Sequence, residues 1–519
     1  MKLCKGVALA LTASYGLTYC HTTKSKLTLE QQGDSLTVIH ITNPTNYILL
    51  PIEEEAPESQ VLLHTGEAAD TDMDIRLAQN QVDYFVPFAL PGGTRNVTVR
   101  VRNKSKDALC WKEIKLSDTF DTTNTEKFRP VYHHTPLYGW MNDANGLVYK
   151  DGEYHLYFQY NPYGSKWGNM HWGHSVSKDL MHWEHLEPAI ARDTLGHIFS
   201  GSSIVDQENV AGYGAGSILA FYTSASDKNG QIQCLAFSKD NGRTFTKYEK
   251  NPILRSSDGL KDFRDPKVFR YEPEDKWVMI VSADKEMRFY DSKNLKDWNY
   301  MSSFGEGYGV QPCQFECPDM VELSVDGDTN RKKWALIVNV NPGCYFGGSA
   351  TQYFTGDFDG TKFICDNQPN VTKWLDWGKD HYATVCFSNT GDRVIAVPWM
   401  SNWQYANNVP TTQYRSGNSI PRDLSLYTSA GETYLKSSPA KELLKLRGKE
   451  EKKHSFKVDR TYNLDKLLSD NTGTYEIEMT IKNRNAEIVG FQLFNSKGEE
   501  VDIYYNLVEK KFAMDRSKS

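Results

Sequence analysis

Short segments in which apolar and polar residues alternate recur along most of the chain. In the first quarter they lie at residues 35–42, 81–90 and 96–101, and Pro or Gly interrupts them. Alternation with a period of two is typical of strands that bury one face. Residues 21–125 are therefore expected to form a small antiparallel β module that ends in a polar linker at 118–125. The module holds no cluster of charges suited to chemistry, so it either binds sugar or packs against the next domain.

A weak repeat follows from residue 126. Short turn motifs, each followed by an aromatic residue, start 61, 54 and 63 residues apart, and each copy is expected to lie in a turn between strand-like runs. A unit of about 60 residues that contains several strands is typical of a β-propeller blade. Residues 126–440 therefore predict five blades. The four motifs are Ser177-Lys178-Asp179, Ser238-Lys239-Asp240, Ser292-Lys293-Asn294 and Thr355-Gly356-Asp357.

The segment 134–162 carries the strongest structural signals of this second domain. Residues 147–149 and 154–160 read as two strands joined by the turn Asp151-Gly152, which is a strong hairpin signal. Ahead of the hairpin, residues 140–146 place Asp143 in a turn crowded with aromatic and amide side chains. Polar groups held on a rigid scaffold beside aromatic walls form sugar pockets. Asp143 is therefore expected to be functional and not merely a turn residue.

The last 80 residues differ from the rest. Residues 439–453 predict a connecting helix, and the runs at 475–482, 486–494 and 501–508 again alternate as strands. About 70 residues are too few for two packed sheets, so residues 441–519 are expected to be the start of an incomplete C-terminal β-sandwich. The predicted fold class is thus all-β throughout.

Composition narrows the possible functions. The 519 residues imply two to four domains. Aromatic residues make up 12% of the chain, more than a core alone requires, and flat rings stack on sugar faces. The net charge is −7 with both signs interspersed, which disfavours a nucleic-acid partner. The cysteines show no C-x-x-C pair and the histidines no cluster, so neither a metal site nor another cofactor is expected.

The first 20 residues have the features of an export signal. Lys2 and Lys5 precede an apolar run at 7–11, and the segment ends near Cys20. Residues 17–20 loosely resemble a bacterial lipoprotein cleavage box, so the alternatives are a lipid anchor at Cys20 and simple cleavage nearby. The chain has no run of 18 apolar residues, and therefore no transmembrane helix is expected. The predicted location is the periplasm or the cell surface, on the outer membrane, of a bacterium.

Two further carboxylates stand out by their neighbours. Asp265 lies between Arg264 and Pro266, where it forms either a surface ion pair or a rigid unit that grips a diol. Glu316 lies next to Phe315, and apolar neighbours raise the pKa of a carboxyl and suit it to general acid catalysis. Because the inner strands of a propeller converge on one channel, Asp143, Asp265 and Glu316 from three blades predict a glycoside-cleaving site.

Five motifs together resemble glycoside hydrolase family 32, the β-fructofuranosidase, inulinase and levanase family, over residues 130–430. More loosely, the chain resembles fructanases of gut Bacteroidota. In the family a five-bladed propeller precedes a β-sandwich. One departure is Ala144, which stands where the family usually has Pro and removes no reacting group. The motifs are WMNDANG at 140–146, FSGS at 199–202, FRDP at 263–266, ECPD at 316–319 and WMSNWQY at 399–405.

The resemblance implies a role for each matched residue. Asp143 would be the nucleophile, Glu316 the acid/base, and Asp265 with Arg264 would hold fructose hydroxyls and stabilise the transition state. The first sugar subsite would be lined by Asn142, Gln159, Trp167, Phe199, Ser200 and Trp399.

The expected function is a retaining hydrolase that releases fructose from levan, inulin or sucrose, with exo action preferred. The alternatives are a fructosyltransferase, a catalytically inactive fructan-binding surface protein, and a propeller hydrolase acting on arabinan or xylan. Product analysis, an assay of fructose release and a substrate screen distinguish them.

Overall fold

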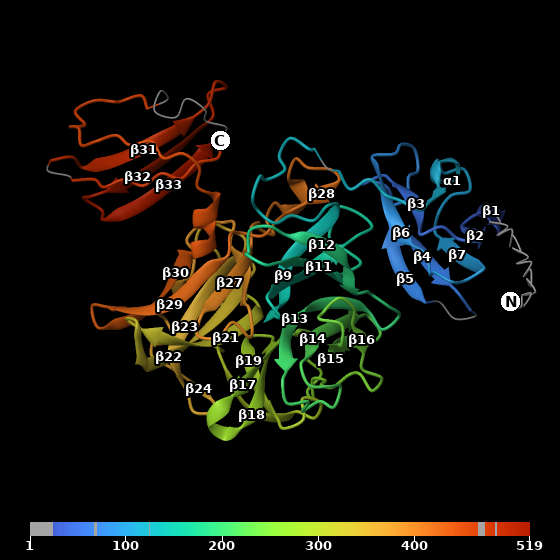
Figure 1. Cartoon of the computed structure of the whole chain (residues 1–519), viewed down its shortest axis with the longest axis horizontal. Helices are drawn as coiled ribbons and strands as arrows, with labels where there is room; N and C mark the ends of the chain where they lie inside the picture. Colours follow the sequence, from blue (N-terminus) through green and yellow to red (C-terminus); the bar gives the residue numbers. More distant parts are fainter. Residues whose placement is uncertain (1–23, 67–69, 124, 465–472, 483–484) are drawn as a thin grey trace, which may run out of the picture. The chain divides into compact units, whose positions relative to one another are not determined.

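The computed structural model describes residues 24–66, 70–123, 125–464, 473–482 and 485–519, almost all of its regular structure being β-strand (Figure 1). The predicted export signal, with Cys20, lies outside the described residues. In the part of the chain that is described, no helix is long and apolar enough to cross a membrane. The chain divides into two units, residues 1–443 and 444–519.

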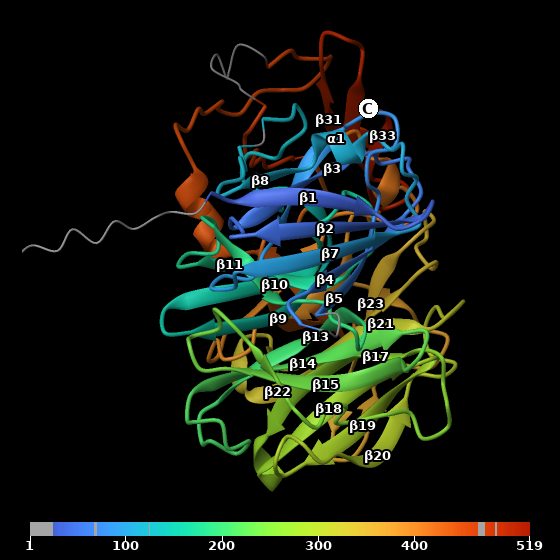
Figure 2. The ribbon, with the colours of Figure 1, turned by 90° about the vertical axis from the view of Figure 1, so that its right-hand side faces the viewer.

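The N-terminal module consists of two antiparallel sheets that share one apolar core. In Figure 2 the strands of the larger sheet lie side by side in the order β1-β2-β7-β4-β5. The strands predicted at 35–42, 81–90 and 96–101 are confirmed as β2, β6 and β7. The larger sheet contains β1 (Lys26–Gln31), β2 (Leu36–Thr42), β4 (Ser59–His64), β5 (Thr71–Ile75) and β7 (Asn96–Arg102); the smaller contains β3 (Tyr47–Ile52), β6 (Tyr84–Ala89) and β8 (Lys115–Ser117); α1 is Cys110–Glu113.

Five antiparallel blades of four strands follow the module, so the predicted propeller is confirmed. The blades are β9 (Gly139–Lys150), β10 (Glu153–Asn161), β11 (His171–Ser177), β12 (Glu184–Ile190); β13 (His197–Asp206), β14 (Ser217–Ser226), β15 (Gly230–Ser238), β16 (Thr246–Lys247); β17 (Phe263–Tyr271), β18 (Lys276–Ala283), β19 (Glu286–Ser292), β20 (Asn299–Phe304); β21 (Phe315–Val325), β22 (Asp328–Val340), β23 (Ala350–Phe358), β24 (Phe363–Cys365); and β26 (Tyr382–Cys386), β27 (Val394–Trp399), β29 (Arg422–Ser429), β30 (Glu432–Pro439). Two short strands, β25 (Lys373–Trp374) and β28 (Tyr414–Arg415), pair with β23 and β9.

The first strands of the blades form the inner ring. Each contacts the next in the order β9, β13, β17, β21, β26, and β26 contacts β9 again. Ser388, just after β26, closes the ring: its backbone N–H donates to the Leu147 carbonyl at 2.9 Å and its hydroxyl to the Ser203 carbonyl at 2.7 Å. The five inner strands therefore surround one channel.

The sequence repeat corresponds to a structural repeat. In the first three blades the motif forms the turn between the third and fourth strands, where a serine hydroxyl bonds to Asp or Asn two residues on. These side chains satisfy backbone groups that the turn leaves without a strand partner. The fourth copy, at 355–357, lies inside β23 and not in a turn.

One local prediction near the site is wrong. The hairpin at 147–160 is confirmed as β9 and β10, but residues 140–146 are part of β9 and not a turn. These residues pair with β10 across an irregular register, and all of them are buried. Because both faces of an inner strand are covered, its sequence does not alternate and does not read as a strand.

The C-terminal unit also differs in detail from the prediction. The helix expected at 439–453 is only the 3₁₀ turn η3 (Lys441–Leu446), because Gly448 and the charged run after it offer no apolar helical face. The described residues of 475–482 form no strand, since they pair in a ladder with none of the other described residues. The antiparallel sheet of this unit is β31 (Ile488–Phe494), β32 (Glu500–Asn506) and β33 (Lys511–Lys518).

Candidate active site

A β-bulge interrupts every inner strand of the propeller, and the predicted catalytic residues lie at these bulges or next to them. The registers shift between Met141 and Ala144, Ile198 and Gly201, Arg264 and Lys267, Glu316 and Asp319, and Tyr382 and Val385. A bulge bends its strand and turns a side chain out of the alternating pattern. The bulges thus explain how residues of a buried strand come to face a common site.

Three of the bulges hold a non-glycine residue in the left-handed region. The φ angles are 64° at Asp265, 44° at Cys317 and 49° at Ala383. Each such residue costs on the order of 1–3 kcal/mol and persists only where the surroundings determine it. Such strain is concentrated at functional sites, which agrees with the position of Asp265.

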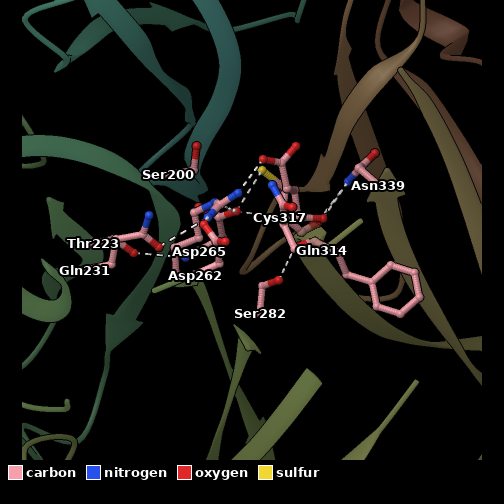
Figure 3. A network of polar contacts seen from close by, with 12 residues as sticks. Ser200, Thr223, Gln231, Asp262, Asp265, Ser282, Gln314, Cys317 and Asn339 are labelled. Atoms are coloured by element: carbon pink, nitrogen blue, oxygen red, sulfur yellow. Dashed lines mark hydrogen bonds and ion pairs between the residues drawn. The ribbon is translucent and has the colours of Figure 1, made fainter. Parts of the chain in front are cut away.

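Asp143 is buried and accepts three hydrogen bonds. The Ser200 hydroxyl donates to its Oδ2 at 2.7 Å, Asn142 Nδ2 donates to its Oδ1 at 3.1 Å, and the Cys317 thiol lies 3.3 Å from Oδ2. The backbone N–H of Cys317 donates to Asp265 Oδ2 at 2.9 Å (Figure 3). Cys317 therefore links two carboxylates that are 122 residues apart in the chain.

Glu316, the neighbour of Cys317, is held by two donors. Arg264 approaches its Oε1 at 2.6 Å, and the Tyr382 hydroxyl donates to its Oε2. The guanidinium also contacts Asp262 at 2.6 Å and lies 3.8 Å from Asp265. The structure thus brings Asp143, Asp265 and Glu316 together around Arg264 and Cys317, as the sequence predicts.

Burial perturbs the two aspartates. It raises the pKa of Asp143 above the ordinary 3.8; the Ser200 hydrogen bond opposes this shift and the charge of Glu316 adds to it. Burial likewise raises the pKa of Asp265 to about 7, although the Arg264 charge opposes the change. A site with three crowded carboxyls resists full ionisation because like charges repel in a dry environment.

Asp265→Asn is expected to stabilise the protein at pH 8. The unfolded pKa of Asp265 is 3.8 and the folded value about 7, so its contribution to the free energy of unfolding is complete below pH 3.8 and is lost as the pH rises to about 7. Asn mimics the neutral form, so Tm should rise by a few degrees at pH 8 and stay unchanged at pH 4. Thermal unfolding followed by circular dichroism at both pH values checks this, and a lower Tm at pH 8 contradicts it.

If Asp143 is the nucleophile that the resemblance implies, Ser200→Ala is expected to make turnover more sensitive to acid. The Ser200 hydroxyl lowers the pKa of Asp143, so its loss raises that pKa further, and a larger share of Asp143 is protonated at low pH. The acidic limb of the profile of kcat/KM against pH should move to higher pH. Ser202→Ala, which removes a hydroxyl bonded to the Pro266 carbonyl, is the matched control. Equal acidic limbs in the wild type and Ser200→Ala contradict the assignment.

The remaining predicted residues lie at different depths. Trp167 is 40% exposed, and its ring meets the half-buried Phe199 edge-on at 6.0 Å. Gln159 is buried and donates to the Ile198 carbonyl at 2.9 Å. Trp399 is fully buried and packs against Trp140 and Tyr382, so it offers no free face to a sugar.

Two residues of the site were missed by sequence reasoning. Cys317 was visible as part of the ECPD motif, but nothing indicated that it bridges Asp143 and Asp265. Tyr382 is the first residue of β26, and nothing in the sequence around it indicates a functional role. It reaches Glu316 only because the fifth blade packs next to the fourth in the closed ring.

A five-bladed propeller with paired carboxylates at its inner bulges defines the class: the architecture and chemical groups are those of a glycoside hydrolase. The chain belongs to glycoside hydrolase family 32. The model "Glycosyl hydrolases family 32 N-terminal domain" matches residues 133–439, and "Glycosyl hydrolases family 32 C terminal" matches 442–519. Residues 33–132 match "Domain of unknown function (DUF4980)".

Individual proteins show the same relationship. The chain is 46% identical to a levanase of Bacillus subtilis over 404 residues, which are 76% of this chain and 59% of that protein. It is 38% identical to invertase 2 of Saccharomyces cerevisiae, covering 72% of this chain and 73% of the invertase. The chain thus spans less than two thirds of the levanase's length.

Solved structures agree in fold. The exo-inulinase of Aspergillus awamori superposes with a TM-score of 0.66 at 30% identity, covering 76% of this chain and 84% of that chain. The fructofuranosidase of Schwanniomyces occidentalis complexed with fructose gives 0.63 at 34% identity, covering 77% and 82%.

Proposed function

We propose that the protein is a retaining β-fructofuranoside hydrolase that releases fructose from levan, inulin or sucrose. The observation that carries the proposal is the arrangement around Cys317, whose thiol meets Asp143 while the adjacent Glu316 is fixed by Arg264. Relatives named levanase, invertase and exo-inulinase support the substrate class.

In the first step Asp143 attacks the anomeric carbon of the fructose unit while Glu316 protonates the departing glycosidic oxygen. The bond to the leaving sugar breaks and an ester between fructose and Asp143 forms. In the second step Glu316 takes a proton from water, the resulting hydroxide attacks the same carbon, and the Asp143 carboxylate departs.

The other charged groups act on the sugar without reacting. Arg264 and Asp265 offer donors and acceptors in a fixed relation, which suits them to grip neighbouring hydroxyls as positive charge develops on the ring. The hydrogen bonds from Ser200 and Asn142 hold the Asp143 carboxylate in one orientation. This pre-organisation favours attack.

Retention requires the two carboxyl groups to lie roughly 5–5.5 Å apart, which leaves no room for a water between them. Methanolysis tests this feature. Methanol captures the intermediate from the face that the leaving group vacated, so the expected product is methyl β-fructofuranoside. The α anomer as initial product contradicts the double-displacement mechanism.

Exo action is the mode we propose on polymers. Chromatography of early products from levan and from inulin tests both the activity and its mode. Free fructose as the sole early product is the expected result, whereas a ladder of oligosaccharides means endo action. Fructosyl oligosaccharides formed at high sucrose identify a transferase, and no product from any fructan contradicts the proposal as a whole.

We also propose that the protein is exported. The basic and apolar segment at residues 1–20 supports this, and so does the name of an extracellular exo-inulinase among the relatives. Polymeric fructan is too large to enter a cell intact, so its hydrolysis requires an external enzyme. Cell fractionation with antibody detection checks the location, and an exclusively cytoplasmic signal contradicts it.

A further inference from the structure

The N-terminal module holds one segment of the propeller that borders the site. This segment, residues 162–170, connects β10 to β11 and carries Trp167. Trp167 is exposed, while Ser165 and Asn169 on either side of it are buried. The module contacts the segment on both sides of the tryptophan, at three separate points.

The first contact is apolar. Tyr163 packs against the hydrophobic core of the module, and its ring lies 5.0 Å from that of Phe88 on β6. The propeller thus contributes one of its own side chains to the module's core. Apolar burial of this kind attaches the two parts but does not by itself fix an orientation.

The second contact is a buried carboxylate. Glu54, in the loop after β3, accepts at Oε1 from both the backbone N–H of Ser165, at 2.9 Å, and the Ser165 hydroxyl, at 2.7 Å. The Tyr84 hydroxyl donates to the same oxygen. Lys166 donates to the Glu54 carbonyl at 3.0 Å. Hydrogen bonds are directional, so this group specifies where residues 165 and 166 lie.

The third contact is on the far side of the tryptophan. Asn169 exchanges two hydrogen bonds with the backbone of Asp74 on β5, one at 2.9 Å and one at 2.7 Å. Arg192 donates to the same Asn169 side chain at 2.7 Å. The backbone of Asn169 is left-handed, with φ at 43°, a conformation that Asn adopts more readily than most residues.

Trp167 lies between these fixed points and contacts His197 and Phe199 of β13. Its ring stacks almost parallel to His197, with centroids 5.9 Å apart, and meets Phe199 edge-on. Phe199 adjoins Ser200, which bonds to Asp143. A displaced segment would therefore move the aromatic wall beside the nucleophile.

We infer that the module is a working part of the fructose site and that Glu54 is a positioning residue for Trp167. The inference rests on the proposed function, since it takes Trp167 as a wall of the first subsite. A module that served only as a cover would be expected to bury apolar groups. A buried carboxylate without a directional task costs free energy, and here its acceptor oxygen is used on the Trp167 segment.

A double-mutant cycle tests the inference. Glu54→Ala is expected to lower kcat/KM on levan roughly tenfold to a hundredfold, mainly through KM, because small misplacements of a pocket wall cost that much. In a Trp167→Ala background the same substitution should change kcat/KM less than twofold. Glu54→Gln keeps an acceptor oxygen and should restore most of the activity. The control is Glu58→Ala. Glu58 lies in the same loop and pairs with Arg76 at 2.7 Å, and its substitution should leave kcat/KM unchanged.

Other outcomes overturn the inference. Losses that multiply in the double variant show that Glu54 does not act through Trp167, and an unchanged kcat/KM in Glu54→Ala shows that the contact is only structural. If Glu54→Ala does not fold, Ser165→Ala removes the partner hydroxyl and is measured in the same cycle. The Kd of fructose, measured by calorimetry in an Asp143→Asn background, repeats the cycle without turnover. It therefore separates a failure of this inference from a failure of the proposed hydrolase activity.

Discussion

Replacing Asp143 with Asn is expected to lower kcat on levan by between about 10⁴- and 10⁶-fold, the range seen when a member of a catalytic unit is removed. An amide has the same shape as the carboxylate but cannot displace the leaving sugar. The amide oxygen can still accept from Ser200, and the amide nitrogen replaces Oδ1 at almost the same volume with loss of the hydrogen bond from Asn142, so the pocket should keep its form. The Kd of fructose should change little. Steady-state rates together with calorimetric titration of fructose measure the two effects separately.

The matched control for Asp143 is Asp227→Asn, the same exchange at an exposed turn between β14 and β15. The kcat of this variant on levan should equal that of the wild type. Rapidly quenched wild-type enzyme should carry a covalent fructosyl group detectable by mass spectrometry, and Asp143→Asn should not. A kcat within tenfold of the wild type would show that another group attacks the sugar.

Replacing Glu316 with Gln is expected to lower kcat on levan by about 10²- to 10⁴-fold, the usual contribution of general acid–base catalysis. The loss should depend on the leaving group. The phenolate of an aryl β-fructofuranoside departs without being protonated, so formation of the fructosyl-enzyme should stay fast. Hydrolysis of that intermediate should become slow. A burst of phenol equal to the enzyme concentration is therefore expected, followed by a slow steady state.

The pH profile adds a second readout for Glu316. The limb that reports the acid/base group should disappear in Glu316→Gln, while the limb that reports Asp143 remains. Glu322→Gln, at an exposed position of the same strand, is the control and should behave as the wild type. An equal loss on levan and on the aryl substrate, with no burst, would contradict the acid/base role.

These predictions share a structural basis that costs stability. The site combines left-handed backbone at Asp265 and Cys317 with carboxyls buried close together. Both features are unfavourable in isolation and are retained only because the ring of blades over-determines them. A gain in stability with a loss of activity is accordingly the expected behaviour of Asp265→Asn.

Much of the site was predictable because its signals are local. The acids at 143, 265 and 316 stand in short motifs whose composition is unusual for a turn, and the blade period of about 60 residues placed them in three different blades. The local shape at residues 140–146 was not predictable. A crowded polar segment that is buried on both faces looks like a turn until its partner strand is known.

The sequence alone determined that the protein is all-β and that its central domain has five blades, and it predicted the three acids that the structure brings together. Alternation, turn chemistry and short motifs depend only on neighbouring residues. The tertiary structure alone decided that Tyr382 and Arg264 hold Glu316, that Cys317 joins Asp143 to Asp265, and that Glu54 reaches Ser165. Each of these contacts joins segments far apart in the chain, and bulges and buried hydrogen bonds of that kind arise from pairing between strands, which no local pattern encodes.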